Sequence, residues 1–462
     1  MFSPNLYIER RKKLLDAIPN GIIIIFGNNK LPMNYIGNSY PFRQDSNFLY
    51  FCGIDRPGLA LVLQKDPEKI ILYGNEDSEE DILWDGKRLP LSDTAERVGI
   101  EKVKSRNSLR ELIHAAGLVD ENIHYLPPYR CDRRNEIQDL LGIPEKQQHE
   151  KASTDLIKAV IQLRSIKSPE EIEEIENNIT HVTAPMFINT AAKVMSMTSE
   201  NEVAASIYNE VLLSGQNMAF TPICTVRGEV LHNETYNNSL YKNSLLLIDA
   251  GAESPLHYAS DITRTLPVSG KFNQQQKDIY NIVLEANLTS ITHCKPGIAY
   301  IDIHKSACLS IISGLIDLNI MEGDKEEIYE SGAHALFMPH GIGHMMGLDV
   351  HDMQDLGEDL VGYSDNYTRS TQFGTSFLRM ARKLEKGMVL TVEPGVYFIP
   401  ALINKWESEN ILAEYINYDA LDDYRTFGGI RIEDDIVITE EGSRLLGKPI
   451  PKSIADIEGI MK

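Results

Sequence analysis

The sequence predicts two folded domains, an α/β domain at the N-terminal end and a larger α+β domain after it. The chain has 462 residues, and a single core usually serves about 150 residues. Residues 1–150 alternate short apolar strands with helical stretches, whereas the later residues pass through helices before their strands begin. We therefore expect the domains to cover residues 1–152 and 153–462.

The N-terminal domain begins with an amphipathic stretch, Tyr7–Ile18, whose apolar residues recur at helical spacing. The apolar run Gly21–Gly27 follows. It is far shorter than a membrane span and predicts one buried strand. Residues 60–75 contain two apolar runs on either side of an Asp66-Pro67 turn, which indicates a β-hairpin.

Two helices are expected to connect the domains. Residues 151–166 have a helical pattern, and a new helix begins directly after them. Ser168 is placed as its N-cap, Pro169 takes the first helical position, and Glu171 completes a capping box. The helical region Lys151–Asn178 is therefore the predicted bridge.

The second domain contains two strands that each carry an acid. Ser244–Gly251 is a continuous apolar run that includes Asp249, so it predicts a strand buried on both faces. Ser260–Gly270 alternates and places Asp261 on one face together with Thr263 and Thr265. The eleven residues between Asp249 and Asp261 include Gly251 and Pro255, which suit a hairpin connection. Asp249 and Asp261 could then face each other.

A further strand is predicted over Gly428–Thr439, with sequence GGIRIEDDIVIT. One face carries Ile430, Ile432, Asp434, Ile436 and Ile438, and the other carries Arg431, Glu433 and Asp435. Three charged neighbours on one face indicate either a solvated surface or a functional site.

Glu393 lies in another apolar stretch, Met388–Phe398, and Pro394-Gly395 ends the strand after it. Four acids therefore belong to otherwise apolar strands: Asp249, Asp261, Glu393 and Glu433. Burying ionised carboxylates is costly unless they are paired or bind a metal. Two divalent cations would cancel four negative charges, whereas Arg264 and Arg431 are the basic residues available nearby. The predicted strand at Gly428–Thr439 is thus interpreted as part of a site.

Three histidines, His340, His344 and His351, cluster within Pro339–Asp352. The spacing of the first two resembles a zinc-binding HExxH helix, but glycine stands at position 341 and another glycine at 343, so that interpretation fails. Four carboxylate ligands and one imidazole favour a hard ion such as manganese, with cobalt, iron or magnesium as alternatives, over tetrahedral zinc.

Composition excludes other classes of protein. The formal net charge is -22, which argues against nucleic acid and against anionic membrane surfaces as partners. The N-terminus is charged from Glu9 onward and lacks the apolar core of a signal peptide. The five cysteines show no CxxC spacing, so we expect reduced core thiols and a cytoplasmic protein.

The motifs DAG…SDITRT, HGIGHMMGLDVHD, TVEPGVY and GGIRIEDDIVIT, in this order, resemble the proline-specific metallopeptidases of the pita-bread family, aminopeptidase P and prolidase. FRQDSNFLYFCGI (Phe42–Ile54) and ILWDGKR (Ile82–Arg88) resemble the N-terminal domain of these enzymes. The resemblance implies a creatinase- or aminopeptidase P-like α/β domain followed by an α+β pita-bread catalytic domain. It implies hydrolysis of Xaa-Pro bonds with two divalent ions, and manganese is expected.

The resemblance also assigns roles. It implies that Asp249, Asp261, His344, Glu393 and Glu433 hold the metals and that Glu393 is the general base. His232 matches a histidine near the scissile bond, and His340 and His351 match residues that hold the substrate carbonyl and stabilise the oxyanion. Arg431 is expected to orient a carboxylate ligand or the proline end, or to form a structural ion pair. Val350 and Tyr397 are the candidates for an apolar wall against the proline ring.

The subfamily stays open between two activities. The segment Asp352–Leu384 resembles prolidase, where Arg379 would bind the C-terminal carboxylate of a dipeptide, whereas the N-terminal domain resembles aminopeptidase P. We place Xaa-Pro aminopeptidase first and keep Xaa-Pro dipeptidase as the alternative; a metal-free pita-bread binding module is a remote third. The expected partners are small peptides with proline in second position and, as is usual in this family, a second copy of the chain in a homodimer or higher oligomer.

Overall fold

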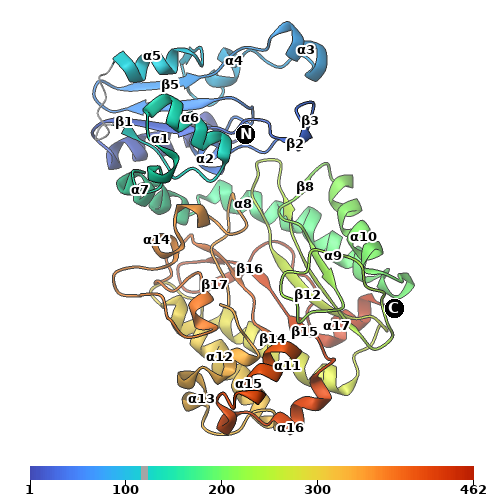
Figure 1. The fold of residues 1–462 in the computed structure, drawn as a ribbon. Helices are drawn as coiled ribbons and strands as arrows, with labels where there is room; N and C mark the ends of the chain where they lie inside the picture. The colour runs from blue at the N-terminus through green and yellow to red at the C-terminus, as the bar shows by residue number, and fades with distance from the viewer. Residues whose placement is uncertain (116–122) are drawn as a thin grey trace. The chain divides into compact units, whose positions relative to one another are not determined.

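The computed structural model describes residues 1–115 and 123–462, and these divide into two compact units (Figure 1). The first comprises Met1–Arg164 with Asp355–Gly357, and the second comprises Ser165–Gln354 with Glu358–Lys462. None of the helices in this described part of the chain has the length and apolar character that a bilayer crossing requires.

The first unit is an α/β fold around a mixed sheet. Within the described residues this sheet has five strands in the order β6-β5-β4-β1-β7: β1 (Ile22–Phe26), β4 (Ala60–Gln64), β5 (Lys69–Tyr73), β6 (Lys102–Lys104) and β7 (Ile123–His124). Strand β1 is buried at every position, as the apolar run predicts. The predicted hairpin is confirmed, because β4 and β5 pair antiparallel around the Asp66-Pro67 turn. A small hairpin joins β2 (Pro32–Tyr35) to β3 (Asn38–Ser39).

Helices complete the first unit: α1 (Pro4–Ala17), α2 (Ser46–Cys52), α3 (Glu79–Asp85), α4 (Leu91–Glu96), α5 (Ser108–Ala115), α6 (Cys131–Leu141) and α7 (Thr154–Ser165). The units meet in the chain at Arg164 and Ser165, later than the predicted change at 152 and 153. Helix α7 stays with the first unit because Tyr50 donates a hydrogen bond to the Leu163 carbonyl at 2.9 Å and Arg164 donates to Asn47 at 2.6 Å.

The second unit begins with α8 (Pro169–Asn178). Its capping box is the predicted one: Ser168 accepts from the Glu171 backbone, and the Glu171 carboxylate accepts from the Ser168 backbone. The chain then continues through α9 (Ala184–Ala191), α10 (Glu200–Leu213), α11 (Gln274–His293), α12 (Tyr300–Asp317), α13 (Lys325–Ser331), α14 (Glu358–Gly362), α15 (Pro400–Ser408), α16 (Tyr418–Leu421) and α17 (Ile454–Ile460). In Figure 1 the strands of this unit lie between α9 and α10 on one side and α11 and α12 on the other.

Two small antiparallel sheets carry the acids. The first has the order β12-β10-β9 and the second the order β13-β16-β17. Their strands are β9 (Ile223–Thr225), β10 (Leu245–Ala250), β12 (Ile262–Pro267), β13 (Val389–Val392), β16 (Asp434–Ile438) and β17 (Ser443–Leu445). Two short ladders lie beside them, β8 (Asn217–Met218) with β11 (Ala252–Glu253) and β14 (Gly395–Tyr397) with β15 (Gly429–Arg431).

The single strand predicted over Gly428–Thr439 is wrong in one respect. The chain forms β15 and then β16, with Ile432 and Glu433 outside both strands. The interruption arises because the two parts have different partners: Arg431 pairs with Gly395 in β14, whereas Asp434 pairs with Val392 in β13.

Asp434, on the otherwise apolar face, is buried in a structural ion pair. Arg264 donates to it at 2.6 Å and Lys452 lies at the same distance from its other oxygen. Burial raises the pKa of Asp434, but Arg264 and Lys452 outweigh burial and hold the pKa below its ordinary value. Arg264 also donates to the carbonyls of Thr263 and Glu433. It therefore fixes the backbone that leads into the acid cluster.

We predict that Arg264→Met lowers the free energy of unfolding of the second unit by roughly 3–5 kcal/mol, because removing one partner of a buried ion pair leaves a buried charge poorly compensated. Urea unfolding followed through Trp406 fluorescence measures this, since Trp406 is buried in the second unit and the other tryptophan, Trp84, is already exposed. The control is Arg444→Met, which removes an exposed ion pair with Glu176 and should cost about 1 kcal/mol or less. Equal losses in the two variants would contradict the prediction.

Candidate metal centre

Each of the two small sheets contributes two acids at matching places. Asp249 lies near the end of β10 and Asp261 directly precedes β12; Glu393 directly follows β13 and Glu433 directly precedes β16. Antiparallel pairing sets Asp249 opposite Thr263 and Val392 opposite Asp434. In each sheet the acid at the end of one strand therefore lies beside the acid at the start of the next.

His344 reaches this cluster from a loop that packs closely on β13. The His344 backbone N–H donates to Thr391 Oγ1 at 3.1 Å, and the Thr391 N–H donates to the His344 carbonyl at 3.0 Å. Glycine is required beside it, because a Cβ at Gly343 would lie 2.2 Å from the Thr391 carbonyl oxygen. This close approach explains Gly343, and a Cβ at Gly341 would likewise lie only 2.7 Å from Leu378 Cα.

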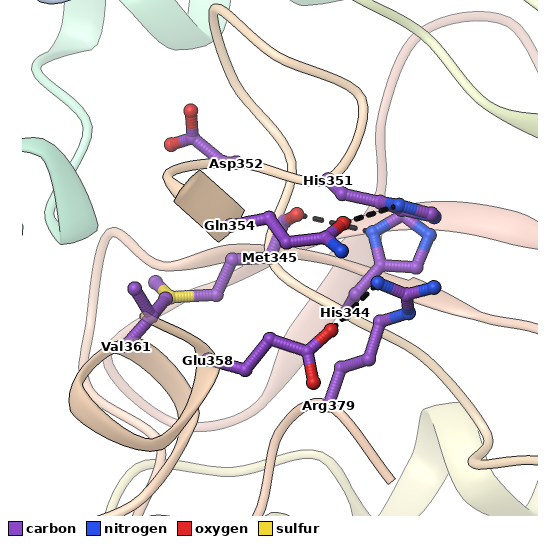
Figure 2. A pocket seen from close by; sticks show the side chains of 8 residues that line it. All are labelled: His344, Met345, His351, Asp352, Gln354, Glu358, Val361 and Arg379. Atoms are coloured by element: carbon purple, nitrogen blue, oxygen red, sulfur yellow. Dashed lines mark hydrogen bonds and ion pairs between the residues drawn. The ribbon is translucent and has the colours of Figure 1, made fainter. Parts of the chain in front are cut away.

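The imidazole of His344 faces carboxylates with an unprotonated nitrogen. Its Nδ1–H donates to the Met345 carbonyl at 3.1 Å (Figure 2). Nε2 then lies 3.4 Å from Asp261 Oδ2 and 3.6 Å from Glu393 Oε1. Burial lowers the pKa of His344 to about 4, so the ring is neutral at neutral pH and Nε2 carries a lone pair. When the carboxyl groups opposite are ionised, lone pairs face lone pairs, and a cation between the groups stabilises the arrangement.

Ligand atoms of Asp261, His344 and Glu433 all lie within 4.8 Å of one another. Burial, followed by the charges of neighbouring acids, raises the pKa values of Asp261 and Glu433 well above their ordinary range. Burial likewise raises the pKa of Glu393 to about 7, against the opposing effect of Arg431. Among the described residues, Oδ1 of Asp249 and Oδ1 of Asp261 are buried with no hydrogen-bond partner. Oxygen atoms with unused lone pairs beside an imidazole fit divalent cations.

Arg431 is part of this cluster. It donates to Asp249 Oδ2 at 2.6 Å, to the Tyr397 hydroxyl at 3.0 Å and to Thr263 Oγ1 at 3.1 Å. It is 4% exposed and therefore compensates one carboxylate charge inside the protein. Arg264, the other basic residue considered from the sequence, turns to Asp434 instead.

The cluster opens into a cavity of about 290 Å³. Ten of the twelve residues predicted for the site line it: His232, Asp249, Asp261, His340, His344, His351, Arg379, Glu393, Arg431 and Glu433. Val350 and Tyr397, the candidates for an apolar wall, are not among the described residues that line this cavity. Its apolar lining consists of Leu231, Pro339 and Phe377, and Phe377 is 57% exposed.

The Tyr397 hydroxyl forms hydrogen bonds with two residues that line the cavity, Arg431 and His340. It accepts from Arg431 and donates to His340 Nε2 at 2.9 Å, while His340 Nδ1–H donates to the Gly341 carbonyl at 2.7 Å. Burial lowers the pKa of His340 to about 4. Nδ1–H of this neutral ring is occupied and Nε2 is an acceptor, so in this state His340 has no free N–H to donate to an oxyanion.

The other two histidines differ in exposure. His232 is exposed and lines the cavity. His351 Nδ1 contacts Gln354 Oε1 at 2.9 Å (Figure 2), and its ring lies 4.3 Å from that of His344. Burial lowers the pKa of His351 to about 2, so the ring is neutral and, with Nδ1 donating to Gln354, Nε2 is an acceptor.

Arg379 lies where this cavity adjoins a smaller one of about 20 Å³ that is lined also by His351, Gln354, Glu358 and Val361. Figure 2 shows the guanidinium beside Glu358, to which it donates at 2.8 Å. The predicted carboxylate-binding arginine therefore already has an anionic partner.

Two segments of the chain match known protein families. Residues 177–440 match metallopeptidase family M24, and residues 7–124 match the aminopeptidase P N-terminal domain. The chain belongs to metallopeptidase family M24. The predicted family and the predicted pair of domains are thereby confirmed.

Relatives of this M24 chain include curated Xaa-Pro aminopeptidases. The Escherichia coli (strain K12) Xaa-Pro aminopeptidase is 31% identical, over 98% of this chain and 96% of its own length. A probable Xaa-Pro aminopeptidase from Coccidioides posadasii is also 31% identical, over 96% of this chain and 92% of its own. The structure of E. coli aminopeptidase P with the inhibitor Pro-Leu superposes with a TM-score of 0.80 at 29% identity, covering 100% of this chain and 98% of that one. A zinc-substituted form of that enzyme in complex with product superposes with a TM-score of 0.78.

Some residues of the M24 site were not predicted. Thr263 donates to Glu433 at 2.6 Å, and Asp435 accepts from the Asp261 backbone at 2.9 Å. Both lie two positions from a predicted ligand, as does Thr391, so the same alternation could have found them. Phe377 and Gln354 lie in the irregular segment around α14, where no periodic signal exists.

The raised carboxyl pKa values predict how metal and protons compete. A folded-state pKa of about 7 for Glu393, above its ordinary value of 4.5, means that the metal-free folded protein binds more protons than the unfolded chain between these values. Its free energy of unfolding therefore falls as pH rises, by about 3 kcal/mol for this group. Metal requires ionised ligands, so its stabilising effect should grow over the same range.

We expect the difference in thermal midpoint between metal-loaded and metal-free protein to widen from roughly pH 5 to pH 8. Differential scanning calorimetry at matched ionic strength measures it. Asp261→Asn should abolish the widening, because the variant lacks a ligand between the two sheets. A difference that is constant or shrinks with pH would contradict the prediction.

Proposed function

We propose that this M24 chain is a metal-dependent Xaa-Pro aminopeptidase that removes the N-terminal residue of peptides with proline in second position. The observation that carries the proposal is the unprotonated Nε2 of His344 facing Asp261 and Glu393 inside an open cavity. Curated relatives over nearly the full length bear the name of this activity. A metal-free binding module would gain nothing from these buried, partner-less acid oxygens.

Two divalent ions would be held by Asp249, Asp261, His344, Glu393 and Glu433. Manganese is the first candidate, because four carboxylates with one imidazole form a predominantly oxygen ligand set. When bound, the ions would act as Lewis acids and lower the pKa of a water molecule, which supplies the nucleophile.

Glu393 is suited to move the proton during hydrolysis. It sits beside His344 at the cavity, with Oε1 3.6 Å from His344 Nε2. A carboxylate held within reach of the nucleophile can act as a general base. Glu393 would accept the proton from the nucleophile and deliver it to the proline nitrogen as the bond breaks.

The histidines and Arg431 would bind and orient the peptide. His232, exposed at the cavity, can donate to the carbonyl oxygen before proline, and His351 presents its Nε2 beside the cluster. His340, held by Tyr397 and Gly341, is assigned to positioning rather than to the oxyanion. Arg431 fixes the orientation of Asp249.

Recognition of proline follows from its amide. The Xaa-Pro nitrogen carries no N–H, and the ring restricts the backbone on both sides. A cavity that binds the free amine with metal and acids, and the ring with apolar side chains, accepts such a substrate. Leu231, Pro339 and Phe377 provide those side chains here.

Two further expectations concern the location of the protein in the cell and its oligomeric state. Free thiols at Cys52, Cys131, Cys224, Cys294 and Cys308 are consistent with a cytoplasmic protein, although Cys131 is exposed and so is not the core thiol expected from the sequence. A homodimer or higher homo-oligomer is the expected assembly.

The activity is tested with manganese-loaded protein and a fluorogenic Xaa-Pro-Yaa peptide. Glu393→Gln should lower kcat by about 10²–10⁴-fold, since proton transfer at this position is lost, while circular dichroism stays unchanged. The control Glu409→Gln alters an exposed acid and should keep full activity. Unchanged kcat in Glu393→Gln, or activity of wild-type protein after chelation, would refute the proposal.

Peptide length separates aminopeptidase from dipeptidase. Because Glu358 already holds Arg379, we expect wild-type protein to cleave Xaa-Pro-Yaa-Zaa at least as well as Xaa-Pro. Arg379→Ala should leave that ratio of kcat/KM within about tenfold, since a free bidentate clamp is not formed. Lys383→Ala, at an exposed neighbour, is the control. Strong dipeptide preference that disappears in Arg379→Ala would assign a prolidase instead.

A further inference from the structure

A second group of metal-binding side chains lies among helices of the second unit. His304 and Cys308 are four residues apart on α12, so they share one helix face. His334 faces them from the 3-10 turn Ala333–Leu336. Ligand atoms of the three lie within 4.8 Å of one another, and Cys308 Sγ is 3.6 Å from His304 Nε2. Each residue is only 1% exposed.

The imidazole of His334 is unusual for a side chain so deeply buried. Among the described residues, neither ring nitrogen has a partner in hydrogen-bond geometry. The Ile328 carbonyl is near enough to raise the pKa, but burial dominates and lowers it to about 4. Leaving a buried polar group unsatisfied costs roughly 1–3 kcal/mol. A ligand bound to His334 would remove this cost. Without one, the buried ring destabilises the fold.

The surroundings fix the orientation of these rings. Tyr329 stacks on His334 with centroids 5.0 Å apart and planes inclined by 22°. Lys305 Nζ lies over the Tyr329 ring, 4.9 Å from its centroid. Burial lowers the pKa of His304 to about 3, so both imidazoles are neutral, as metal ligation requires. A nearby carbonyl such as that of Ile328 is the usual second partner of a metal-bound histidine.

We propose that His304, Cys308 and His334 form a binding site for one soft metal ion, Cu⁺ or Zn²⁺, separate from the carboxylate centre. Thiolate and imidazole ligands select these ions, whereas manganese and magnesium prefer carboxylates. A monovalent ion with one thiolate leaves no net charge in the enclosed site, so Cu⁺ is favoured over Zn²⁺. None of the three residues is among the described residues that line the catalytic cavity.

Binding would replace the Cys308 thiol proton with a sulfur–metal bond and release that proton to solvent. The ion would join α12 to the 3-10 turn, which leads through Phe337 into the loop that carries His340. It would act as a structural clasp and take no part in peptide hydrolysis.

Cobalt provides a selective probe because the catalytic ligands contain no sulfur. Co²⁺ added to reduced wild-type protein whose carboxylate centre is already loaded with manganese should give a near-ultraviolet sulfur-to-cobalt charge-transfer band that saturates at one sulfur-bound cobalt per chain. Cu⁺ or Zn²⁺ should displace it, and X-ray absorption should then show a metal–sulfur bond; for zinc its length is about 2.3 Å.

Substitutions locate the signal. Cys308→Ser should abolish the band, and His334→Leu should weaken Co²⁺ affinity by about 10–100-fold or more. Cys294→Ser, at another buried thiol, and Cys131→Ser, at the exposed thiol, should leave the band unchanged. All four variants should retain peptidase activity.

The wild-type measurement decides the matter even if a variant fails to fold. Absence of a charge-transfer band together with absence of sulfur-bound copper or zinc, in protein whose carboxylate centre is loaded, would overturn the proposal. A band that survives Cys308→Ser in folded protein would do so as well.

Discussion

The arrangement of this site depends on negative charge that cannot stay uncompensated inside the protein. Asp261, Glu393 and Glu433 lie close to the neutral ring of His344. Asp249 lies on β10, beside the strand that Asp261 directly precedes, and Arg431 offsets one charge of the four acids. Three negative charges therefore remain when all four acids are ionised. Two divalent ions would turn this into one positive charge, which an anionic nucleophile would cancel. Without metal, burial and the charges of neighbouring acids raise the pKa values of Asp261, Glu393 and Glu433, so these three groups tend to hold protons instead.

Strand pairing brings the charges together without long side chains. In each small sheet an acid ends one strand and another acid precedes the neighbouring strand, so backbone hydrogen bonds set their separation. The break at Ile432 and Glu433 is part of this arrangement, because β15 presents Arg431 beside β14 while β16 pairs with β13. Thr263 then joins the two halves by accepting from Arg431 and donating to Glu433. A continuous strand would have placed Arg431 and Glu433 in one ladder.

Local signals in the sequence predicted the local parts of this structure. The capping box at Ser168, the hairpin of β4 and β5 and the acid-bearing strands follow from periodicity and from residues within a few positions of each other. The four acids were singled out because each belongs to a predicted strand that is otherwise apolar. Contacts between distant segments escaped prediction: Arg264 with Asp434, Tyr397 behind His340, and Phe377 in the cavity wall. No periodic pattern records which segments meet, so these depend on the folded chain.

The carboxylate centre and the proposed thiolate site place different demands on an ion. The first has an excess of about three negative charges, oxygen ligands and an open cavity, so it needs several positive charges and can accept substrate. The second has one ionisable thiol and two neutral imidazoles, each residue only 1% exposed, so a single positive charge satisfies it. Affinity for nitrogen and sulfur ligands rises toward copper and zinc, whereas oxygen ligands suit manganese and magnesium. Charge and ligand softness therefore favour different ions at the carboxylate centre and at the proposed thiolate site. A chain with one catalytic centre and one structural metal site needs this difference, so that each site takes its own ion.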